Sequence, residues 1–238
     1  MINEVDLAFK PKSLFENRAQ ASIELLDILP QDEFKNGNWL VLAISNGAVP
    51  FTISICKRFG LYFDMIFTEP IYAPNNINCE IAMVSETEEI VIHSSLVESF
   101  GINLDYIYNE ANRKHEEKIL KKVYRLRKGE HLSVLEDKNI LLVDEGCESG
   151  LTVLSAIKTV INKNAKSVYF ATPLIASDIV YDIQTVCDDI FCVKQIDNFV
   201  DTKHYYDLLP KLQAESIYAM LETSAEFLPF KKKQGDNI

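Results

Sequence analysis

The sequence predicts an α/β fold in which helices flank a mostly parallel, twisted sheet. Short apolar runs without polar alternation are typical of strands buried on both faces. Here such runs alternate with segments whose apolar residues recur at helical spacing. The 238 residues contain no tandem repeat, low-complexity stretch or long linker. We therefore predict a single domain over residues 1–238, with a core from about 14 to 221.

Strands and helices also alternate in the first half of the chain. Pro30 ends the first predicted helix, and Pro50 is favourable in the first turn of the second. The segment after the second predicted strand is rich in Pro and Asn. The elements expected here are a helix over 17–29, a strand over 39–44, a turn over 45–48, a helix over 50–59, a strand over 63–68, a loop over 70–78 and a hairpin of 82–85 with 90–93.

The second half begins with the clearest buried strand, residues 138–144. The elements expected after it are a helix over 151–162, a strand over 167–171, a helix over 178–186 capped by Ser177, and a strand over 190–193. One face of the first of these helices carries Leu151, Leu154, Ile157, Val160 and Ile161. The polar C-terminal residues 228–238 are expected to be flexible.

Composition excludes several classes of protein. Lys and Arg number 24 against 35 Asp and Glu, a net charge of −11, which argues against a surface built for nucleic acid or anionic lipid. No apolar run approaches the length of a membrane span, and the N-terminus lacks an apolar signal core. The five cysteines form no CxxC pair. We therefore expect a cytoplasmic protein without a structural metal, a membrane partner or a nucleic-acid partner.

Positive charge is concentrated in residues 110–128, although the chain as a whole is negative. This island includes Arg113 and Arg125, with Tyr124 between them. It is either a solvated helix face or a cationic flap that reaches a polyanionic ligand, and composition does not choose between the two.

The segment 140–152 (ILLVDEGCESGLT) carries the clearest chemical signal. A buried strand ends in Asp144 and Glu145, a loop with two glycines follows, and then a helix begins. Ligands bind beyond the carboxyl ends of such strands, and a helix N-terminus with hydroxyl donors binds phosphate. The carboxylates would repel that phosphate, so they face sugar hydroxyls or a cation. The segment predicts a phosphosugar site, although an ordinary strand–helix turn remains open.

Two other motifs resemble parts of this segment. A Walker A loop requires different glycine spacing and a Lys that is missing here, so nucleotide triphosphatase chemistry is disfavoured. The glycine-rich motif of methyltransferases that use S-adenosylmethionine fits less well, because Glu148 replaces a small residue and the next strand ends in Ala171-Thr172-Pro173 instead of an acidic residue. The methyltransferase stays a weaker alternative.

The chain resembles the type I phosphoribosyltransferases over roughly 14–221. Besides 140–152, the segments that carry the resemblance are Phe15-Glu16-Asn17-Arg18, LAISNGAVPFTISICKRFG, Ala73-Pro74-Asn75-Asn76 with Glu80, Tyr124-Arg125, Ala171-Thr172-Pro173 and His204-Tyr205-Tyr206-Asp207. The resemblance implies the fold of that family, with a small hood, and transfer of phosphoribose from phosphoribosyl diphosphate to a nitrogenous base with release of pyrophosphate. It makes the protein a glycosyltransferase of nucleotide metabolism, compatible with a homodimer.

The resemblance also implies roles for individual residues. Asp144 and Glu145 would hold the ribose hydroxyls, and Mg²⁺ would be chelated mainly by the phosphoribosyl ligand, with no dedicated protein ligands. The residues that would wrap the 5′-phosphate are Gly146, Cys147, Glu148, Ser149, Gly150, Leu151 and Thr152. The residues that would contact pyrophosphate are Ser45, Asn46, Gly47 and Ala48. The flap that would close over the diphosphate includes Arg113, Tyr124 and Arg125.

Three residues depart from the family pattern. Ser45 and Glu69 stand where relatives usually have a basic residue, and Glu148 stands where a small residue is usual. These departures favour an alternative from another class, a non-catalytic regulatory protein that binds a phosphoribosyl ligand or nucleotide. If the loop holds a phosphate, Glu148 must point outward or pair with a cation, such as one from 113–128.

Overall fold

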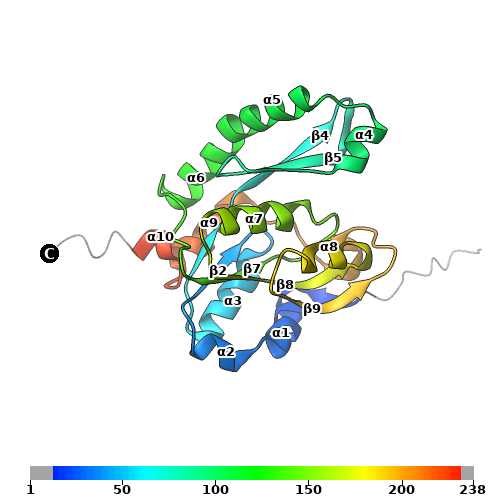
Figure 1. Ribbon diagram of the computed structural model, residues 1–238. Coiled ribbons are helices and arrows are strands. Elements are labelled where there is room, and N and C mark those ends of the chain that lie inside the picture. Colours follow the sequence, from blue (N-terminus) through cyan, green and yellow to red (C-terminus); the bar gives the residue numbers. More distant parts are fainter. Residues whose placement is uncertain (1–12, 232–238) are drawn as a thin grey trace, which may run out of the picture.

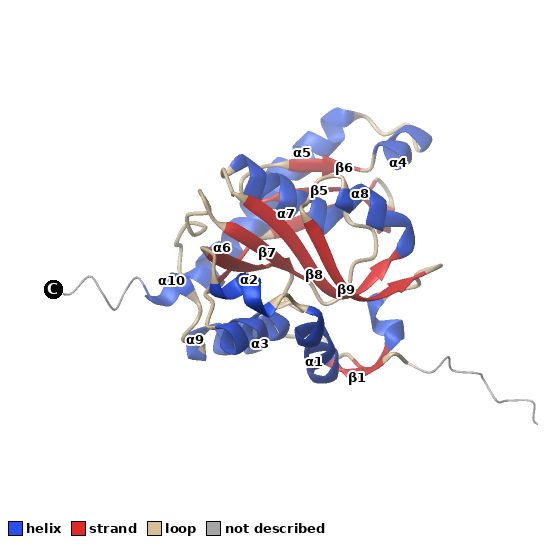
Figure 2. Cartoon of the chain, turned by 60° about the horizontal axis from the view of Figure 1, so that its bottom comes forward, coloured by secondary structure: helices blue, strands red, loops and turns tan. Residues whose placement is uncertain are grey.

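A five-stranded parallel sheet forms the centre of the computed structural model, which describes residues 13–231. Its strands, in spatial order, are β3 (Phe63–Met65), β2 (Trp39–Ala43), β7 (Asn139–Val143), β8 (Ser167–Ala176) and β9 (Asp189–Ile196). Figure 2 shows β7, β8 and β9 side by side. Leu141 pairs with Tyr169 in the parallel β7–β8 register, so the predicted α/β sheet is confirmed.

Helices cover both faces of this sheet (Figure 1). One face is covered by α1 (Arg18–Ile28), α2 (Gln31–Lys35) and α3 (Val49–Phe59), and the other by α7 (Leu151–Asn162) and α8 (Val180–Gln184). At the β3 edge lie α9 (Ala214–Thr223) and α10 (Leu228–Lys231). The short strands β1 (Phe15–Asn17) and β10 (Tyr206–Leu208) form a separate parallel pair. No helix among the described residues is long and apolar enough to cross a membrane.

The residues between β3 and β7 build the hood, a second layer above α7. Its antiparallel sheet consists of β4 (Thr68–Ala73), β5 (Asn76–Ser85) and β6 (Ile90–Ile92). Its helices are α4 (Ser94–Ser99), α5 (Leu104–Lys114), a π-helical turn (His115–Ile119) and α6 (Leu120–Arg127). Figure 1 shows α5 and α6 on the outer side of this sheet and α7 between it and the central sheet.

The hood corrects two expectations from the sequence. The strand predicted over 63–68 is divided, because the chain leaves the central sheet after Met65 and enters the hood at Thr68. The loop predicted over 70–78 is instead the hairpin of β4 and β5. Pro70 is tolerated because β4 is an edge strand that pairs only with β5. Asn75 adopts the left-handed φ of 63° between the two strands, a conformation in which Asn is enriched.

Three further boundaries or faces differ from the predictions. Helix α7 has the predicted bounds, but it buries Val153 and Ala156 as well and leaves Ile161 exposed, because sheets pack on two of its sides. The helix predicted over 178–186 is a 3₁₀ turn (Ser177–Ile179) followed by α8, without a side-chain cap. The C-terminal segment predicted to be flexible begins too early, since α10 is helical and packs against β3; residues 232–238 lie outside the described part.

Candidate active site

The two predicted ligand loops meet at the carboxyl edge of the central sheet. The turn 45–48 follows β2 and the loop 144–150 follows β7, and these are neighbouring parallel strands. The Ser45 hydroxyl donates a hydrogen bond of 2.6 Å to Oδ1 of Asp144. The same hydroxyl oxygen accepts a bond of 3.1 Å from the Ala48 N–H, so it joins both loops. The structure therefore brings together the segments that the sequence singled out.

Asp144 is a buried carboxyl at the centre of this edge, with 7% of its surface exposed. Besides Ser45, the N–H of Glu145 donates to Oδ1 at 2.8 Å. Burial raises the pKa of Asp144 to about 7, and the charges of Glu145 and Glu148 act in the same direction, while the two hydrogen bonds oppose them. A buried carboxyl that titrates near neutrality is typical of functional sites.

The Glu145 side chain contacts the first residue of α1. Its Oε2 lies 2.7 Å from Nε of Arg18, and another nitrogen of that guanidinium donates to the Pro210 carbonyl at 2.8 Å. The Tyr206 hydroxyl donates to the Glu145 carbonyl at 3.1 Å. Arg18 is thus a site residue that the sequence indicated only through the family resemblance. Arg18 and Glu145 are separated by 127 positions along the chain, so local patterns did not link them.

Gly47 lies directly under the Glu145 carboxylate. A Cβ atom added at Gly47 would fall 1.9 Å from Cδ of Glu145, so this position requires glycine for close approach. Gly47→Ala should displace Glu145, break its pair with Arg18 and lower the free energy of unfolding by about 1–3 kcal/mol. Urea unfolding measures this loss.

The effect of Gly47→Ala depends on Glu145 if this geometry is correct. In a Glu145→Ala background, which removes the obstructing side chain, the same substitution should cost much less. Equal losses in both backgrounds would show that Gly47 is needed for another reason.

The loop after Glu145 forms the entrance to α7. Gly150, with φ 75°, is the N-cap residue, and no side chain caps this helix end. The N–H of Cys147 donates to the Leu174 carbonyl at 2.9 Å, which fixes the loop to β8. Burial raises the pKa of the Cys147 thiol well above its usual value. Burial thus favours the neutral thiol, which argues against a nucleophilic role for Cys147.

A cavity of about 160 Å³ lies between this loop and the hood. The residues that line it are Glu80, Asp144, Gly146, Cys147, Glu148, Ser149, Gly150 and Thr152. Most of the predicted phosphate loop thus faces one cavity, whereas Glu145 and Leu151 do not line it. Glu80 comes from β5 of the hood and was not predicted as a site residue. Burial raises the pKa of its carboxyl, and the nearby charge of Glu148 raises it further.

A second cavity of about 240 Å³ adjoins the first, with Glu80 and Thr152 in the walls of both. The residues that complete its lining are Ile44, Ser45, Asn46, Met65, Ile66, Phe67, Thr68, Pro70, Met83 and Lys122. Of the predicted pyrophosphate turn, Ser45 and Asn46 face this cavity. Gly47 and Ala48 do not line it.

Glu148 is exposed, in agreement with one of the two arrangements predicted for it. Its Oε1 accepts a hydrogen bond of 2.7 Å from the N–H of Thr202. No ion pair between Glu148 and a cation from 113–128 is found among the described residues, and Glu148 also lines the first cavity.

Removing the Glu148 charge should not weaken the binding of a phosphate ligand. We expect Glu148→Ala to leave the affinity for ribose 5-phosphate unchanged or to increase it, because a carboxylate opposes phosphate binding. Asp144→Ala should reduce the affinity. Calorimetric titration of both variants measures the difference, and Glu148→Gln serves as the control that can keep the Thr202 bond without the charge. A marked loss in both Glu148 variants would make this carboxylate a ligand group.

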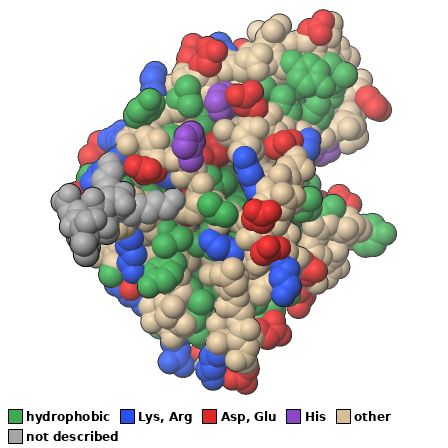
Figure 3. All heavy atoms as spheres, turned by 60° about the vertical axis from the view of Figure 1, so that its left-hand side comes forward, with side chains coloured by type: hydrophobic (Ala, Val, Ile, Leu, Met, Phe, Trp, Pro, Cys, Tyr) green, Lys and Arg blue, Asp and Glu red, His purple; other side chains and the backbone are tan. Residues whose placement is uncertain are grey.

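The basic island forms one helical segment in the outer layer of the hood. Arg113 pairs with two carboxylates of its own segment, and Arg125 pairs with Glu215 of α9. Tyr124 is 72% exposed. On the face in Figure 3, acidic and basic side chains are interspersed. The roles of Arg113, Tyr124 and Arg125 in a flap stay a prediction.

Comparisons with known proteins indicate the family of this chain. A family model described as "Phosphoribosyl transferase domain" matches residues 12–207. Two curated relatives from Mycobacterium tuberculosis, "Putative phosphoribosyl transferase Rv0571c" and "Putative phosphoribosyl transferase MT0597", are each 24% identical over 181 residues, which is 76% of this chain and 40% of theirs. The chain thus spans less than half the length of these relatives.

A solved structure shows the same fold. The crystal structure of TT1426 from Thermus thermophilus superposes with a TM-score of 0.70 and 20% sequence identity, covering 89% of this chain and 99% of that one. The family model extends from the residues just before β1 to β10, so it includes both predicted ligand loops and the hood. The chain therefore belongs to the type I phosphoribosyltransferase family.

Proposed function

We propose that this protein binds phosphoribosyl diphosphate with Mg²⁺ and transfers its phosphoribose to a nitrogenous base. The observation that carries the proposal is the pair of adjoining cavities at the carboxyl edge of the sheet. The first lies between the loop at the start of α7 and Glu80 of the hood, and the second adjoins the turn after β2. A ligand with a phosphate, a sugar and a diphosphate could place these groups in turn at the α7 loop, at Asp144 and at the turn after β2.

Each part of the site has a chemical task in this proposal. The main-chain N–H groups at the start of α7 bind the 5′-phosphate, supported by the helix dipole and the hydroxyls of Ser149 and Thr152. The ionised carboxylate of Asp144 accepts hydrogen bonds from ribose hydroxyls. Glu145, held by Arg18, keeps the turn 45–48 against the loop.

The residues present fit a ligand that carries Mg²⁺ with it. The carboxylate oxygens of Asp144 and Glu80 beside the first cavity are donors of the kind that this cation prefers. No group of three or more His, Cys, Asp or Glu in the described chain is placed to hold a metal by itself. When bound, the ion would neutralise charge on the departing diphosphate.

The reaction breaks the bond between ribose C1 and the pyrophosphate oxygen and forms a bond from C1 to the nitrogen of the base. The nitrogen releases its proton to water, and pyrophosphate leaves with the electron pair of the broken bond. The protein contributes by orienting the ligand and excluding water instead of forming a covalent intermediate.

A second candidate is a non-catalytic protein that binds the phosphoribosyl ligand to regulate a partner. The charge of the cavity walls favours it, because Lys122 is the one Lys or Arg among the described residues that line the two cavities. That lysine is already paired with Glu69 at 2.7 Å. The methyltransferase alternative is excluded by the family to which the chain belongs.

Calorimetry with phosphoribosyl diphosphate, with and without Mg²⁺, tests the proposal. Pyrophosphate release is then measured with a panel of purine, pyrimidine and other nitrogenous bases. We expect Mg²⁺-dependent binding and release with at least one base. Binding without release with any base supports the regulatory protein, and no binding overturns both candidates.

A further inference from the structure

Lys122 places a positive charge from the hood at the second cavity. It lies on α6, and its Nζ donates to the Thr68 carbonyl at 2.9 Å and lies 2.7 Å from Oε1 of Glu69. About a third of the Lys122 side chain is exposed, and the residue lines the second cavity. Glu69 belongs to β4, so the pair joins a helix and a strand of the hood.

The position of Lys122 relative to the loops makes it relevant to an anion. The cavity that it lines is also lined by Ser45 and Asn46 from the turn after β2, and by Thr152 from the first turn of α7. An anion that extends from the phosphate loop toward this turn would therefore enter the cavity that Lys122 lines. Glu80 is also in this wall and would oppose the anion.

We propose that Lys122 binds the diphosphate of the phosphoribosyl ligand and that Glu69 competes with the diphosphate for it. This inference rests on the proposed function, because the ligand must first occupy the phosphate loop. The turn after β2 supplies Ser45 in place of a cation, so the helix of the hood provides the positive charge instead. Ligand binding exchanges the Glu69 carboxylate for a diphosphate oxygen at the same ammonium.

The competition predicts effects of opposite sign for the two partners. Lys122→Met removes a charge-assisted contact and should weaken binding of magnesium pyrophosphate by about 10- to 100-fold. Glu69→Gln frees the Lys122 ammonium and should increase the affinity for magnesium pyrophosphate by about 3- to 10-fold. In the Lys122→Met background, Glu69→Gln should lose most of this effect, because the competition no longer exists.

Calorimetric titrations with three probes test these expectations. Magnesium pyrophosphate and phosphoribosyl diphosphate should respond to the variants, whereas ribose 5-phosphate, which lacks the diphosphate, should bind each variant like the wild type. Lys121→Met, at the exposed neighbouring position on α6, is the matched control and should change none of the three affinities. Circular dichroism of each variant verifies that the fold is retained.

The outcomes separate this inference from the proposed function. If the wild type binds phosphoribosyl diphosphate and Lys122→Met binds it equally well, the role of Lys122 is wrong and the function stands. The assignment of Glu69 is wrong if Glu69→Gln weakens pyrophosphate binding. A wild type that does not bind phosphoribosyl diphosphate overturns the proposed function, and this inference with it.

Discussion

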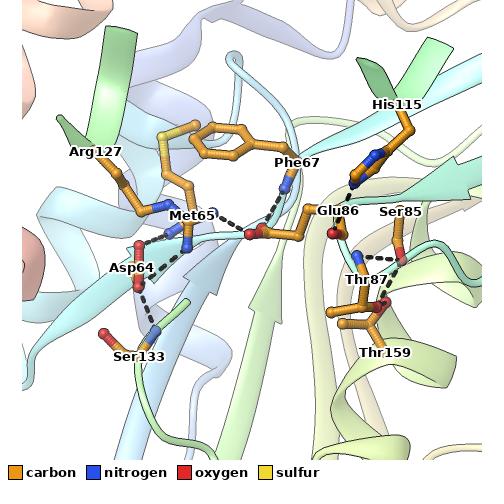
Figure 4. Close-up of polar contacts among 10 residues, drawn as sticks. All are labelled: Asp64, Met65, Phe67, Ser85, Glu86, Thr87, His115, Arg127, Ser133 and Thr159. Carbon is orange, nitrogen blue, oxygen red and sulfur yellow. Dashed lines mark hydrogen bonds and ion pairs between the residues drawn. The ribbon is translucent and has the colours of Figure 1, made fainter. Parts of the chain in front are cut away.

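Replacing Arg127 with Met should lower the free energy of unfolding by about 3–5 kcal/mol, because it leaves two buried carboxylates without their cation. The Arg127 side chain is fully buried at the end of α6. Its guanidinium forms an ion pair with Glu86 and lies 3.8 Å from Asp64 and 4.7 Å from the centre of the Phe67 ring (Figure 4). All these groups are desolvated, so water cannot replace the lost partner.

The cluster joins the hood to the central sheet. Asp64 lies on β3, Glu86 follows β5, and Arg127 ends α6. Glu86 also accepts a hydrogen bond of 3.0 Å from the Phe67 N–H, and Asp64 accepts one of 2.9 Å from the Ser133 N–H. Since Phe67 lines the second cavity, loss of Arg127 should also weaken the binding of ligands in that cavity.

Equilibrium unfolding in urea measures the loss in free energy of unfolding, and two further variants serve as controls. Arg125→Met removes an exposed ion pair with Glu215 and should cost less than about 1 kcal/mol. Adding Glu86→Gln to Arg127→Met removes one unpaired carboxylate and should recover part of the loss. A loss below about 1 kcal/mol for Arg127→Met would contradict the importance of the buried pair.

The loss should depend on pH in a defined direction. Burial raises the pKa of Glu86 even with Arg127 present, and Arg127 lowers it. Without Arg127 the native state therefore retains the Glu86 proton to higher pH than the unfolded chain does. Because the native state then binds more protons, its stability increases as the pH falls. The cost of Arg127→Met should consequently be smaller at pH 5 than at pH 8.

The parts of this structure that were predictable from sequence are those encoded by neighbouring residues. Strand β7, the loop from Asp144 and the helix that begins at Leu151 are consecutive, and each has a distinct local pattern. The hood strand β4 was missed because Pro70 normally indicates a loop, and only the edge position of β4 makes it acceptable. Its status as an edge depends on tertiary structure.

Contacts between distant residues account for what could not be predicted in the site. Lys122 was one of several lysines in the basic island, and only the packing of α6 against β4 distinguishes it from its exposed neighbour Lys121. Glu80 was noted only as part of a family segment, and it lines both cavities because the hood lies against the two ligand loops. Residue type and spacing contain no information on such distances.

The buried charge of Asp144 destabilises the native state, and the same charge is the proposed acceptor for the ribose hydroxyls. Its native pKa of about 7 lies above the ordinary value of 3.8, so between these values the native state holds a proton that the unfolded chain has released. Stability therefore falls as the pH rises from about 4 to 7, by a total on the order of 4 kcal/mol. An asparagine at this position has no charge to bury, and its amide oxygen can still accept from Ser45 and from the Glu145 N–H.

Asp144→Asn should therefore increase the free energy of unfolding at pH 8 by a few kcal/mol. It should also lower the affinity for ribose 5-phosphate by about 10- to 100-fold, because the ionised acceptor for the sugar hydroxyls is lost. At pH 5, where the wild-type carboxyl is protonated, the two proteins should be nearly equally stable. Urea unfolding from pH 5 to 8 and calorimetric titration at pH 8 measure the two effects. Ser45→Ala is the control: the Ser45 bond lowers the pKa of Asp144, so its loss should move the transition to higher pH. If Asp144→Asn is less stable than the wild type at pH 8, or if the stability difference does not change with pH, the carboxylate is not a strained ligand group but part of the scaffold.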